Sequence, residues 1–307
     1  MTARVTVVGS LNMDLIVRAP RIPRPGETII GRGFHVAPGG KGANQAVAAA
    51  RLGAQVSLVG RVGQDSFAAD LLANLKAAGV NHTYVSQDAE TATGVALIEV
   101  DDAGQNSIVV AAGANMRLGP AEIEAARGVI TGADILLLQL ESPLETVSQA
   151  AQLAQAHHVP VILNPAPAQP LPEELLKAVT ILAPNESETA ILAGLPTGSL
   201  AEIKAAAAKL RGFGVETVIL TLGERGALLA GADGSRHFPA FRVTPVDTTA
   251  AGDAFVGALA VALAEGRPLP EAIRWANAAG ALATTRLGAQ PSLPSRQAVE
   301  ELAASAR

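Results

Sequence analysis

The sequence contains no cysteine in its 307 residues. Disulfide bonds, thiolate catalysis and cysteine-ligated zinc are therefore excluded. A cysteine-free composition is also compatible with a reducing compartment, so we expect a cytoplasmic protein.

Positive charge, aromatic side chains and long apolar runs are scarce as well. The formal net charge is −5 and aromatic residues make up 3% of the chain. Binding to duplex nucleic acid needs clustered Lys and Arg, and binding to single strands needs aromatic platforms, so we expect no nucleic-acid partner. No signal-like segment opens the sequence, and no apolar run approaches the ~20 residues that span a bilayer. An enzyme without a membrane partner is the favoured class.

Apolar runs alternate with amphipathic helical patterns along most of the chain. This alternation predicts an α/β fold, with a mostly parallel central sheet covered by helices on both faces. The predicted strands are residues 5–9, 56–60, 135–139, 159–163, 179–183 and 217–221, and the predicted helices include residues 65–78, 143–156 and 200–211.

Two segments break the alternation. Residues 15–36 and 91–111 have the pattern of strands joined by turns, with no helix between them. They predict a small antiparallel β lid, built from residues 15–38 and 92–112 and inserted into a single domain that covers residues 1–307. Such a lid would cover a ligand or form an interaction surface.

The most informative stretch is residues 247–255, Asp-Thr-Thr-Ala-Ala-Gly-Asp-Ala-Phe. It follows a strand-like run, residues 241–246, and opens a helical pattern, residues 251–264. A glycine-containing turn that leads into a helix points backbone N–H groups at one spot and so favours an anion such as phosphate. An acidic side chain there predicts chemistry, and Asp253 is the candidate base. The alternative is ordinary helix capping by Asp and Thr with a tight turn at Gly252.

Standard nucleotide fingerprints are missing. Residues 38–45 lack the G-x-x-x-x-G-K-[ST] spacing, with Gly42 where Ser or Thr would be needed, and no G-x-G-x-x-G follows the first strand. In open parallel sheets ligands bind at the carboxyl ends of the strands. Asn12 and Asp14 follow the first strand, and their i, i+2 spacing in an extended chain would present both side chains to the vicinal hydroxyls of a sugar. An Asx-turn is the alternative.

Other polar residues follow later strands. Residues 39–45 begin a predicted helix at 44–52, where glycines allow a ligand to approach the backbone, although a plain turn explains them equally well. Glu141 ends a buried strand, where a charge is unexpected. Residues 185–188 start a helix after another strand and are also consistent with simple capping. Residues 221–226 form a glycine-bracketed turn between strands.

Together these motifs resemble the PfkB, or ribokinase-type, family of carbohydrate kinases over essentially the whole chain. Residues 39–49 and 247–253 are similar to its two signatures, and five shorter motifs match in order and spacing: residues 9–14, 139–143, 185–188, 221–223 and 288–292. The sequence departs from the commoner pattern at Ala250, where many members carry Gly, and at Ala254, where Ser or Thr is frequent.

The resemblance implies transfer of the γ-phosphoryl group of ATP to the 5-hydroxyl of a pentose, D-ribose. Asp253 would take the hydroxyl proton, and the N–H groups of residues Ala250, Ala251, Gly252 and Asp253 would stabilise the phosphoryl oxygens. The sugar contacts implied are Asn12, Met13, Asp14, Gly40, Lys41, Asn44, Glu141 and Asp253. Those implied for ATP are Asn185, Thr221, Gly223, Gly226, Gly252 and Asn277.

The resemblance also implies two cations and a partner subunit. Mg²⁺ would be organised by Glu188, and K⁺ would lie beside the anion site among Asp247, Thr249, Ala283, Arg286, Gly288 and Ser292. A homodimer through the β lid is expected, because pairing satisfies exposed strand edges. The alternatives are a kinase for another sugar or nucleoside such as 2-deoxyribose, a non-catalytic sugar-binding protein, and a nucleotide hydrolase without an acceptor.

Overall fold

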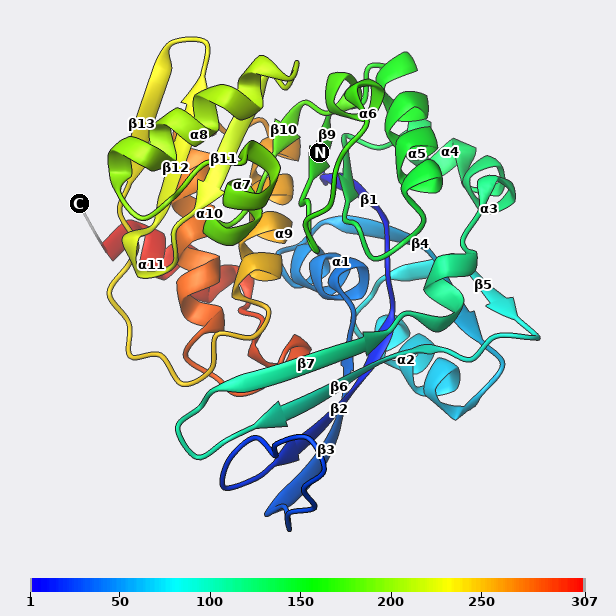
Figure 1. The fold of residues 1–307 in the computed structure, drawn as a ribbon. Helices are drawn as coiled ribbons and strands as arrows, with labels where there is room; N and C mark the ends of the chain where they lie inside the picture. The colour runs from blue at the N-terminus through cyan, green and yellow to red at the C-terminus, as the bar shows by residue number, and fades with distance from the viewer. Residues whose placement is uncertain (1, 306–307) are drawn as a thin grey trace.

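The computed structural model describes residues 2–305 and contains a large sheet, a small sheet and flanking helices (Figure 1). The large sheet has nine strands in the order β13-β12-β11-β10-β9-β8-β1-β4-β5. All pairs from β11 to β5 are parallel, and β12 and β13 extend the sheet as antiparallel strands. The strands are β1 Arg4–Val8, β4 Gln55–Gly63, β5 Asn81–Asp88, β8 Ile135–Leu138, β9 Val161–Leu163, β10 Ile181–Leu182, β11 Thr217–Thr221, β12 Ala227–Gly231 and β13 Gly234–Phe238.

The predicted mostly parallel sheet is confirmed. One predicted strand is wrong: residues 241–246 pair with no other strand. This segment follows the last strand of the sheet and contains Pro245, which has no N–H to donate to a ladder. It instead runs as an extended connection to the start of α9.

Helices cover both faces of the large sheet and enclose two apolar cores. Alternate residues of one strand point to opposite faces, so that Val7 belongs to one core and Val8 to the other. The first face carries α1 Lys41–Arg51, α2 Ser66–Ala77, α9 Ala251–Ala264, α10 Leu269–Ala283 and α11 Arg296–Ser305. The second carries α3 Pro120–Ala125, α4 Arg127–Thr131, α5 Leu144–Ala156, α6 Glu173–Ala178, α7 Glu186–Ala193 and α8 Leu200–Gly212.

The small sheet projects from the body of the molecule as a lid (Figure 1). Its strands lie in the order β3-β2-β6-β7, with bounds β2 Asn12–Arg18, β3 Gly33–Gly39, β6 Gly94–Val100 and β7 Asn106–Ala111. The hairpins β2–β3 and β6–β7 are antiparallel, as predicted, and the two hairpins join through a parallel pairing of β2 with β6. Two separate insertions therefore make one sheet, which we call the lid sheet.

Alanine and glycine bring α1 and α9 into close contact. A Cβ on Gly257 of α9 would lie 2.8 Å from Ala48 Cβ and 3.0 Å from Gln45 O. Only a residue without a side chain allows this approach. It sets the beginning of α1 against the beginning of α9, where the polar residues of both signatures meet.

Within residues 2–305, none of the helices combines the length and the apolar character that crossing a membrane requires.

Candidate active site

The start of α9 is open to a ligand. The N–H groups of Ala250, Gly252 and Asp253 donate no hydrogen bond within residues 2–305, whereas Ala251 N–H donates to Thr248 O at 3.2 Å. No heavy atom lies within 4 Å of the place where a Cβ of Gly252 would be. Unpaired N–H groups at the positive end of a helix dipole attract anions. The open space at Gly252 is therefore suited to a phosphoryl group.

Ala250 has a left-handed backbone, with φ at 59°. This region is strained for a residue with a Cβ and free for glycine. Ala250 therefore adopts, with some backbone strain, a conformation that the commoner glycine would adopt freely, directly beside the open N–H groups.

Asp253 lies in the first turn of α9 and is buried. Its Oδ2 accepts a hydrogen bond from Asn44 Nδ2 at 2.9 Å, and its Oδ1 accepts one from Gln45 Nε2 at 3.0 Å. Burial raises the pKa of Asp253, while the charge of Lys41 and the two amide donors oppose this rise. The result is a carboxyl group more basic than usual, as a general base requires.

Asn12 and Asp14 lie on the same face of β2, as their spacing predicts, and both are buried. Asn12 Nδ2 donates to Glu141 Oε2 at 3.4 Å, and Glu141 also accepts from Lys41 N at 3.2 Å. Gly40, with φ at 87°, passes so close that a Cβ there would lie 2.6 Å from Asn12 N. One polar cluster is therefore formed where the start of β2 in the lid sheet, the segment after β8 and the start of α1 meet.

Asp14 has the most perturbed carboxyl group of this cluster. Burial, with the nearby charges of Glu141 and Asp253, raises the pKa of Asp14 to about 7, and Lys41 partly offsets the rise. At neutral pH the group is thus divided between its neutral and charged forms. A ligand hydroxyl that donates to it would favour the charged form.

Lys41 links the two ends of the cluster. Burial lowers the pKa of Lys41, but the carboxylates of Asp253, Glu141, Glu188 and Asp14 raise it by more, so that it stays above the ordinary value. The ammonium group is therefore charged among four acidic side chains. It supplies positive charge that acts on both Asp253 and Glu188.

Apart from Gly252 at the start of α9, the residues expected to bind ATP lie at the start of α7, at the end of β11 and the turn after it, and on α10. Asn185 caps α7: its Oδ1 accepts from Glu188 N, and Glu188 accepts from Asn185 N and Nδ2 at 2.8 and 2.9 Å. Thr221 pairs with Asn185 through an isolated bridge, and Gly223 and Gly226 bracket the turn that follows. Asn277 Nδ2 lies 3.3 Å from Pro239 O and so contacts the connection after β13.

The residues expected around K⁺ lie on two loops that Asp247 ties together. Its Oδ1 accepts from Thr249 N and Oγ1, and its Oδ2 accepts from Gly288 N at 2.8 Å. Val246 N and Asp247 N donate to Thr284 O, beside Ala283 at the end of α10. Ser292 Oγ donates to Ala289 O within the second of these loops, which also carries Arg286.

Met13 does not share the orientation of its neighbours. It alternates with Asn12 and Asp14 along β2, and its side chain is buried in the apolar core. Any contact of Met13 with a ligand would therefore involve its backbone.

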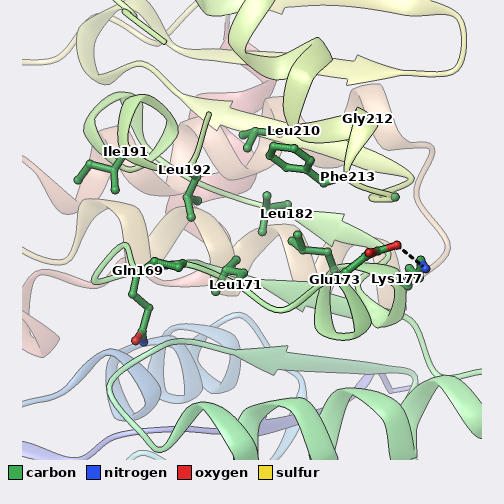
Figure 2. A pocket seen from close by; sticks show the side chains of 13 residues that line it. Gln169, Leu171, Glu173, Lys177, Leu182, Ile191, Leu192, Leu210, Gly212 and Phe213 are labelled. Carbon is green, nitrogen blue, oxygen red and sulfur yellow. Dashed lines mark ion pairs between the residues drawn. The ribbon is translucent and has the colours of Figure 1, made fainter. Parts of the chain in front are cut away.

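A cavity of about 670 Å³ lies elsewhere, between β10 and the helices α6, α7 and α8 (Figure 2). Its walls are mostly apolar, with the Glu173–Lys177 ion pair at one side. None of the predicted site residues lines it. Sugars need several convergent polar groups, which this cavity lacks and the cluster around Asp253 has. The labelled apolar side chains are Leu171, Leu182, Ile191, Leu192, Leu210 and Phe213.

Two buried residues of the cluster were not among the predicted contacts. Ser10 Oγ donates to Glu141 Oε2 at 2.5 Å. Asn115, on the 3₁₀ helix η1 Gly113–Arg117 after β7, accepts from Leu11 N and donates to Leu11 O and to Asn12 Oδ1 at 2.7 Å. Asn115 therefore fixes which way the Asn12 amide faces. The only signal in the sequence is a polar residue after an apolar hairpin, and such a residue is usually exposed.

Comparison with known proteins identifies the family. The family model described as pfkB family carbohydrate kinase matches residues 2–296. The ribokinase of Bacillus subtilis is 45% identical over 299 residues, covering 97% of this chain and 98% of its own, and the deoxyribokinase of Salmonella typhi is 40% identical over 298 residues, covering 97% of both. A solved structure of Arabidopsis thaliana ribokinase complexed with ribose and ATP superposes with a TM-score of 0.90 at 37% identity, covering 99% of both chains.

The family match, together with the sheet covered by helices on both faces, defines the class of protein, a small-molecule kinase. The chain belongs to the pfkB family of carbohydrate kinases, and it is an ATP-dependent sugar kinase.

Proposed function

We propose that this kinase transfers the γ-phosphoryl group of ATP to the 5-hydroxyl of D-ribose. The observation that carries the proposal is the position of Asp253, a buried carboxyl group directly beside the unpaired N–H groups that open α9. The similarity to ribokinases, at 45% identity for the enzyme of Bacillus subtilis, supports ribose as the acceptor.

At the start of α9, the side chain of Asp253 and the backbone N–H groups have separate roles in the reaction. Asp253 takes the proton of the 5-hydroxyl as its oxygen attacks the γ-phosphorus. The N–H groups of Gly252 and Asp253 stabilise negative charge on the phosphoryl oxygens, and Lys41 adds positive charge nearby. Phosphoryl transfer depends mainly on positioning and electrostatics, so a single proton acceptor is sufficient.

The acceptor sugar occupies the polar cluster at the start of β2, around Asn12, Asp14 and Glu141. Asp14 and Asn12 bind vicinal hydroxyls from one face of β2, together with Glu141, which accepts from Asn12, and Asn44, which donates to Asp253. Asn44 Oδ1 is buried and has no hydrogen-bond partner among the described residues, so it is available to a sugar hydroxyl. Closure of the lid sheet over the sugar would exclude the water that could otherwise accept the phosphoryl group.

Mg²⁺ fits the nucleotide side of the cluster. Within residues 2–305, no group of three or more His, Cys, Asp or Glu side chains is arranged to hold a metal ion. A lone buried carboxylate suits Mg²⁺, which keeps most of its waters and binds through substrate phosphates. Burial raises the pKa of Glu188, and a nearby cation would relieve this cost. When bound with ATP, Mg²⁺ would neutralise charge on the β- and γ-phosphates.

K⁺ fits the loops that Asp247 ties together. Carbonyl oxygens can replace the hydration shell of this ion, and the loops offer carbonyls of Thr249, Ala283, Arg286 and Gly288 beside the Asp247 and Ser292 side chains. Since Asp247 is five residues before Gly252, an ion held by these loops would also constrain the backbone that carries the open N–H groups. K⁺ would thereby hold the anion site in shape.

The second candidate is a 2-deoxyribose kinase, because the deoxyribokinase of Salmonella typhi is nearly as similar. The test that separates the two is ATP turnover with D-ribose, with 2-deoxyribose and with no acceptor, each in K⁺ and in Na⁺ at equal ionic strength. We expect D-ribose to exceed 2-deoxyribose in kcat/KM by roughly 5- to 150-fold, because the missing hydroxyl leaves a buried partner unpaired at a cost of ~1–3 kcal/mol. We also expect faster turnover in K⁺.

Each of the other outcomes has a distinct meaning. A preference for 2-deoxyribose would show that this sugar, and not ribose, is the acceptor, and would leave the proposed phosphoryl transfer unchanged. Turnover without any sugar would indicate a hydrolase, and sugar binding without turnover would indicate a binding protein. Equal rates in Na⁺ and K⁺ would count against the K⁺ site.

We also propose that two chains pair through the lid sheet. Val36, Leu15, Leu97 and Val109 lie opposite one another across its four strands and so share one face. Val36, Leu97 and Val109 are exposed, as are Phe34 and Val17 in the next row. A contiguous apolar patch on a projecting sheet is typical of a protein–protein interface, and β7 leaves an unpaired edge beside it.

Val109→Glu should convert the dimer into a monomer, because the new charge would be buried without a partner. Light scattering after size exclusion should give twice the 31.1 kDa chain mass for the wild type and 31.1 kDa for the variant. Ile191→Glu is the matched control, because Ile191 on α7 has the same 63% exposure as Val109 and lies outside the lid sheet. A monomeric wild type, or a Val109→Glu variant that stays dimeric, would rule out this interface.

A further inference from the structure

Gln45 contacts the proposed base from a place that no ligand reaches. It follows Asn44 on α1 and is fully buried, at 0% exposure. Asn44 and Gln45 each donate to a different oxygen of Asp253. Whereas Asn44 lies at the sugar site, Gln45 is enclosed by protein. We therefore expect its hydrogen bond to Asp253 to hold the carboxyl group before and after the sugar binds.

The Gln45 amide has a single allowed orientation. Its Oε1 accepts from Gln139 Nε2 at 2.5 Å, and its Nε2 donates to Asn164 Oδ1 at 3.1 Å as well as to Asp253. An amide donates only through nitrogen and accepts only through oxygen. A flipped Gln45 would set its oxygen against the oxygens of Asp253 and Asn164, so the network keeps the N–H groups directed at the base.

The strand ends in turn hold the partners of Gln45. Gln139 follows β8, and Asn164 follows β9 and donates to Ala183 O, beyond β10, at 3.0 Å. Gly9, after β1, packs so closely that a Cβ there would lie 1.9 Å from Gln139 Oε1. A buried amide network therefore runs across the carboxyl ends of the central strands and ends on Asp253.

We propose that Gln45, held by Gln139 and Asn164, is a positioning residue for phosphoryl transfer that orients the Asp253 carboxylate toward the acceptor hydroxyl. Gln45 acts through Asp253, so the proposal rests on the role of Asp253 as the base.

Loss of the Gln45 hydrogen bond should also change the acidity of the base. Burial raises the pKa of Asp253, and Lys41, Asn44 and Gln45 counteract the rise. The other charged groups coupled to Asp253 are Asp14 on β2, Glu141 after β8 and Glu188 on α7, which repel its charged form. Without the Gln45 amide donor, the neutral form of the Asp253 carboxyl group is favoured more, so a higher pH is needed to ionise this base.

The test is Gln45→Met, which keeps the length of the side chain and removes the donor. Single-turnover phosphoryl transfer is followed against pH with saturating ATP and D-ribose. The midpoint of the acid limb should rise by about one pH unit or more, as expected for loss of a hydrogen bond to a charged group. Rate lost at neutral pH should therefore return partly in alkaline buffer, and ribose affinity should change little.

Thr6→Val is the matched control. Thr6 on β1 is buried and donates to Val129 O at 2.8 Å, so the variant also loses one hydrogen bond of a buried side chain, but to α4, on the face of the sheet opposite to α9 and Asp253. It should lower stability and leave the midpoint unchanged. Gln139→Met serves as a second probe, because it frees Gln45 Oε1 without touching the base and should move the midpoint in the same direction by less.

The outcomes separate the two claims. An unmoved midpoint in Gln45→Met that still binds ribose would overturn the positioning role. If Gln45→Met does not fold, Gln139→Met decides: an upward shift supports the role and an unmoved midpoint overturns it. Asp253→Asn is run in parallel. Wild-type rates in that variant would remove the base itself, whereas an inactive Asp253→Asn beside an unmoved Gln45→Met would remove only the role of Gln45.

Discussion

Asp253→Asn should lower kcat by at least ~10²-fold, the usual loss for a positioned general base. Asparagine has the same shape but cannot accept the proton of the 5-hydroxyl. It also presents an NH₂ group to one of the two amide donors, Asn44 Nδ2 or Gln45 Nε2, so that one of these hydrogen bonds is lost. The measurement is steady-state turnover at saturating ATP and D-ribose.

Ligand binding provides the control for Asp253→Asn. The charge of Asp253 contributes to the raised pKa of Asp14, so its removal should let Asp14 ionise more readily and should preserve ribose affinity at neutral pH. Titration calorimetry with ribose and with ATP checks this expectation. Turnover within a few-fold of wild type would contradict the assignment of the base, and loss of both ligands would show that the variant had lost its structure.

Asp14→Asn has the second-largest expected effect, on sugar affinity. Replacing the charged acceptor of a vicinal diol should cost about 1.5–3 kcal/mol, or roughly 10- to 150-fold in the dissociation constant of ribose above pH 7. Because the pKa of Asp14 is raised to about 7, wild-type affinity should fall as the pH drops below 7, and the variant should show no such fall. At low pH the two proteins should therefore converge.

The same substitution should change stability in the opposite sense. The pKa of Asp14 rises from 3.8 to about 7 on folding, so the folded state retains a proton that the unfolded chain has released in between. The contribution of Asp14 to the free energy of unfolding is fully present below pH 3.8, and it is lost as the pH rises through about 7. Without ligand at pH 8, Asp14→Asn should melt no lower than wild type.

The binding measurement is the decisive one for Asp14. A ribose affinity at pH 8 that is unchanged in Asp14→Asn would contradict the sugar-binding role of Asp14.

The main fold features were predictable because each has a local cause. Buried parallel strands are continuous apolar runs, and the helices between them have a 3.6-residue period, so the bounds of β1, β8 and β11 were predicted to within one residue, whereas β4 extends three residues beyond its predicted end. The segment 241–246 has the composition of a strand, but pairing depends on a neighbour that the local sequence does not reveal. The edge hairpin β12–β13 was likewise not recognised as part of the large sheet.

The candidate site was predictable mainly through the resemblance to the two family signatures. Asn44 and Asp253 are 209 residues apart, lie in the helices α1 and α9, and were expected in one site because each belongs to one of these signatures. Asn115, Ser10 and the network around Gln45 could not be inferred, because a buried polar side chain and an exposed one look alike in sequence. Hydrogen bonding across the folded core decides between them.

The most direct test of the account is identification of the product. Purified protein is incubated with ATP, Mg²⁺, K⁺ and D-ribose, and phosphorus and carbon NMR locate the transferred group while ADP is quantified. We predict one equivalent of ADP for each phosphorylated sugar, with the phosphate on the 5-oxygen of ribose. ADP without a phosphorylated sugar, or a phosphate on another oxygen, would contradict the proposed reaction.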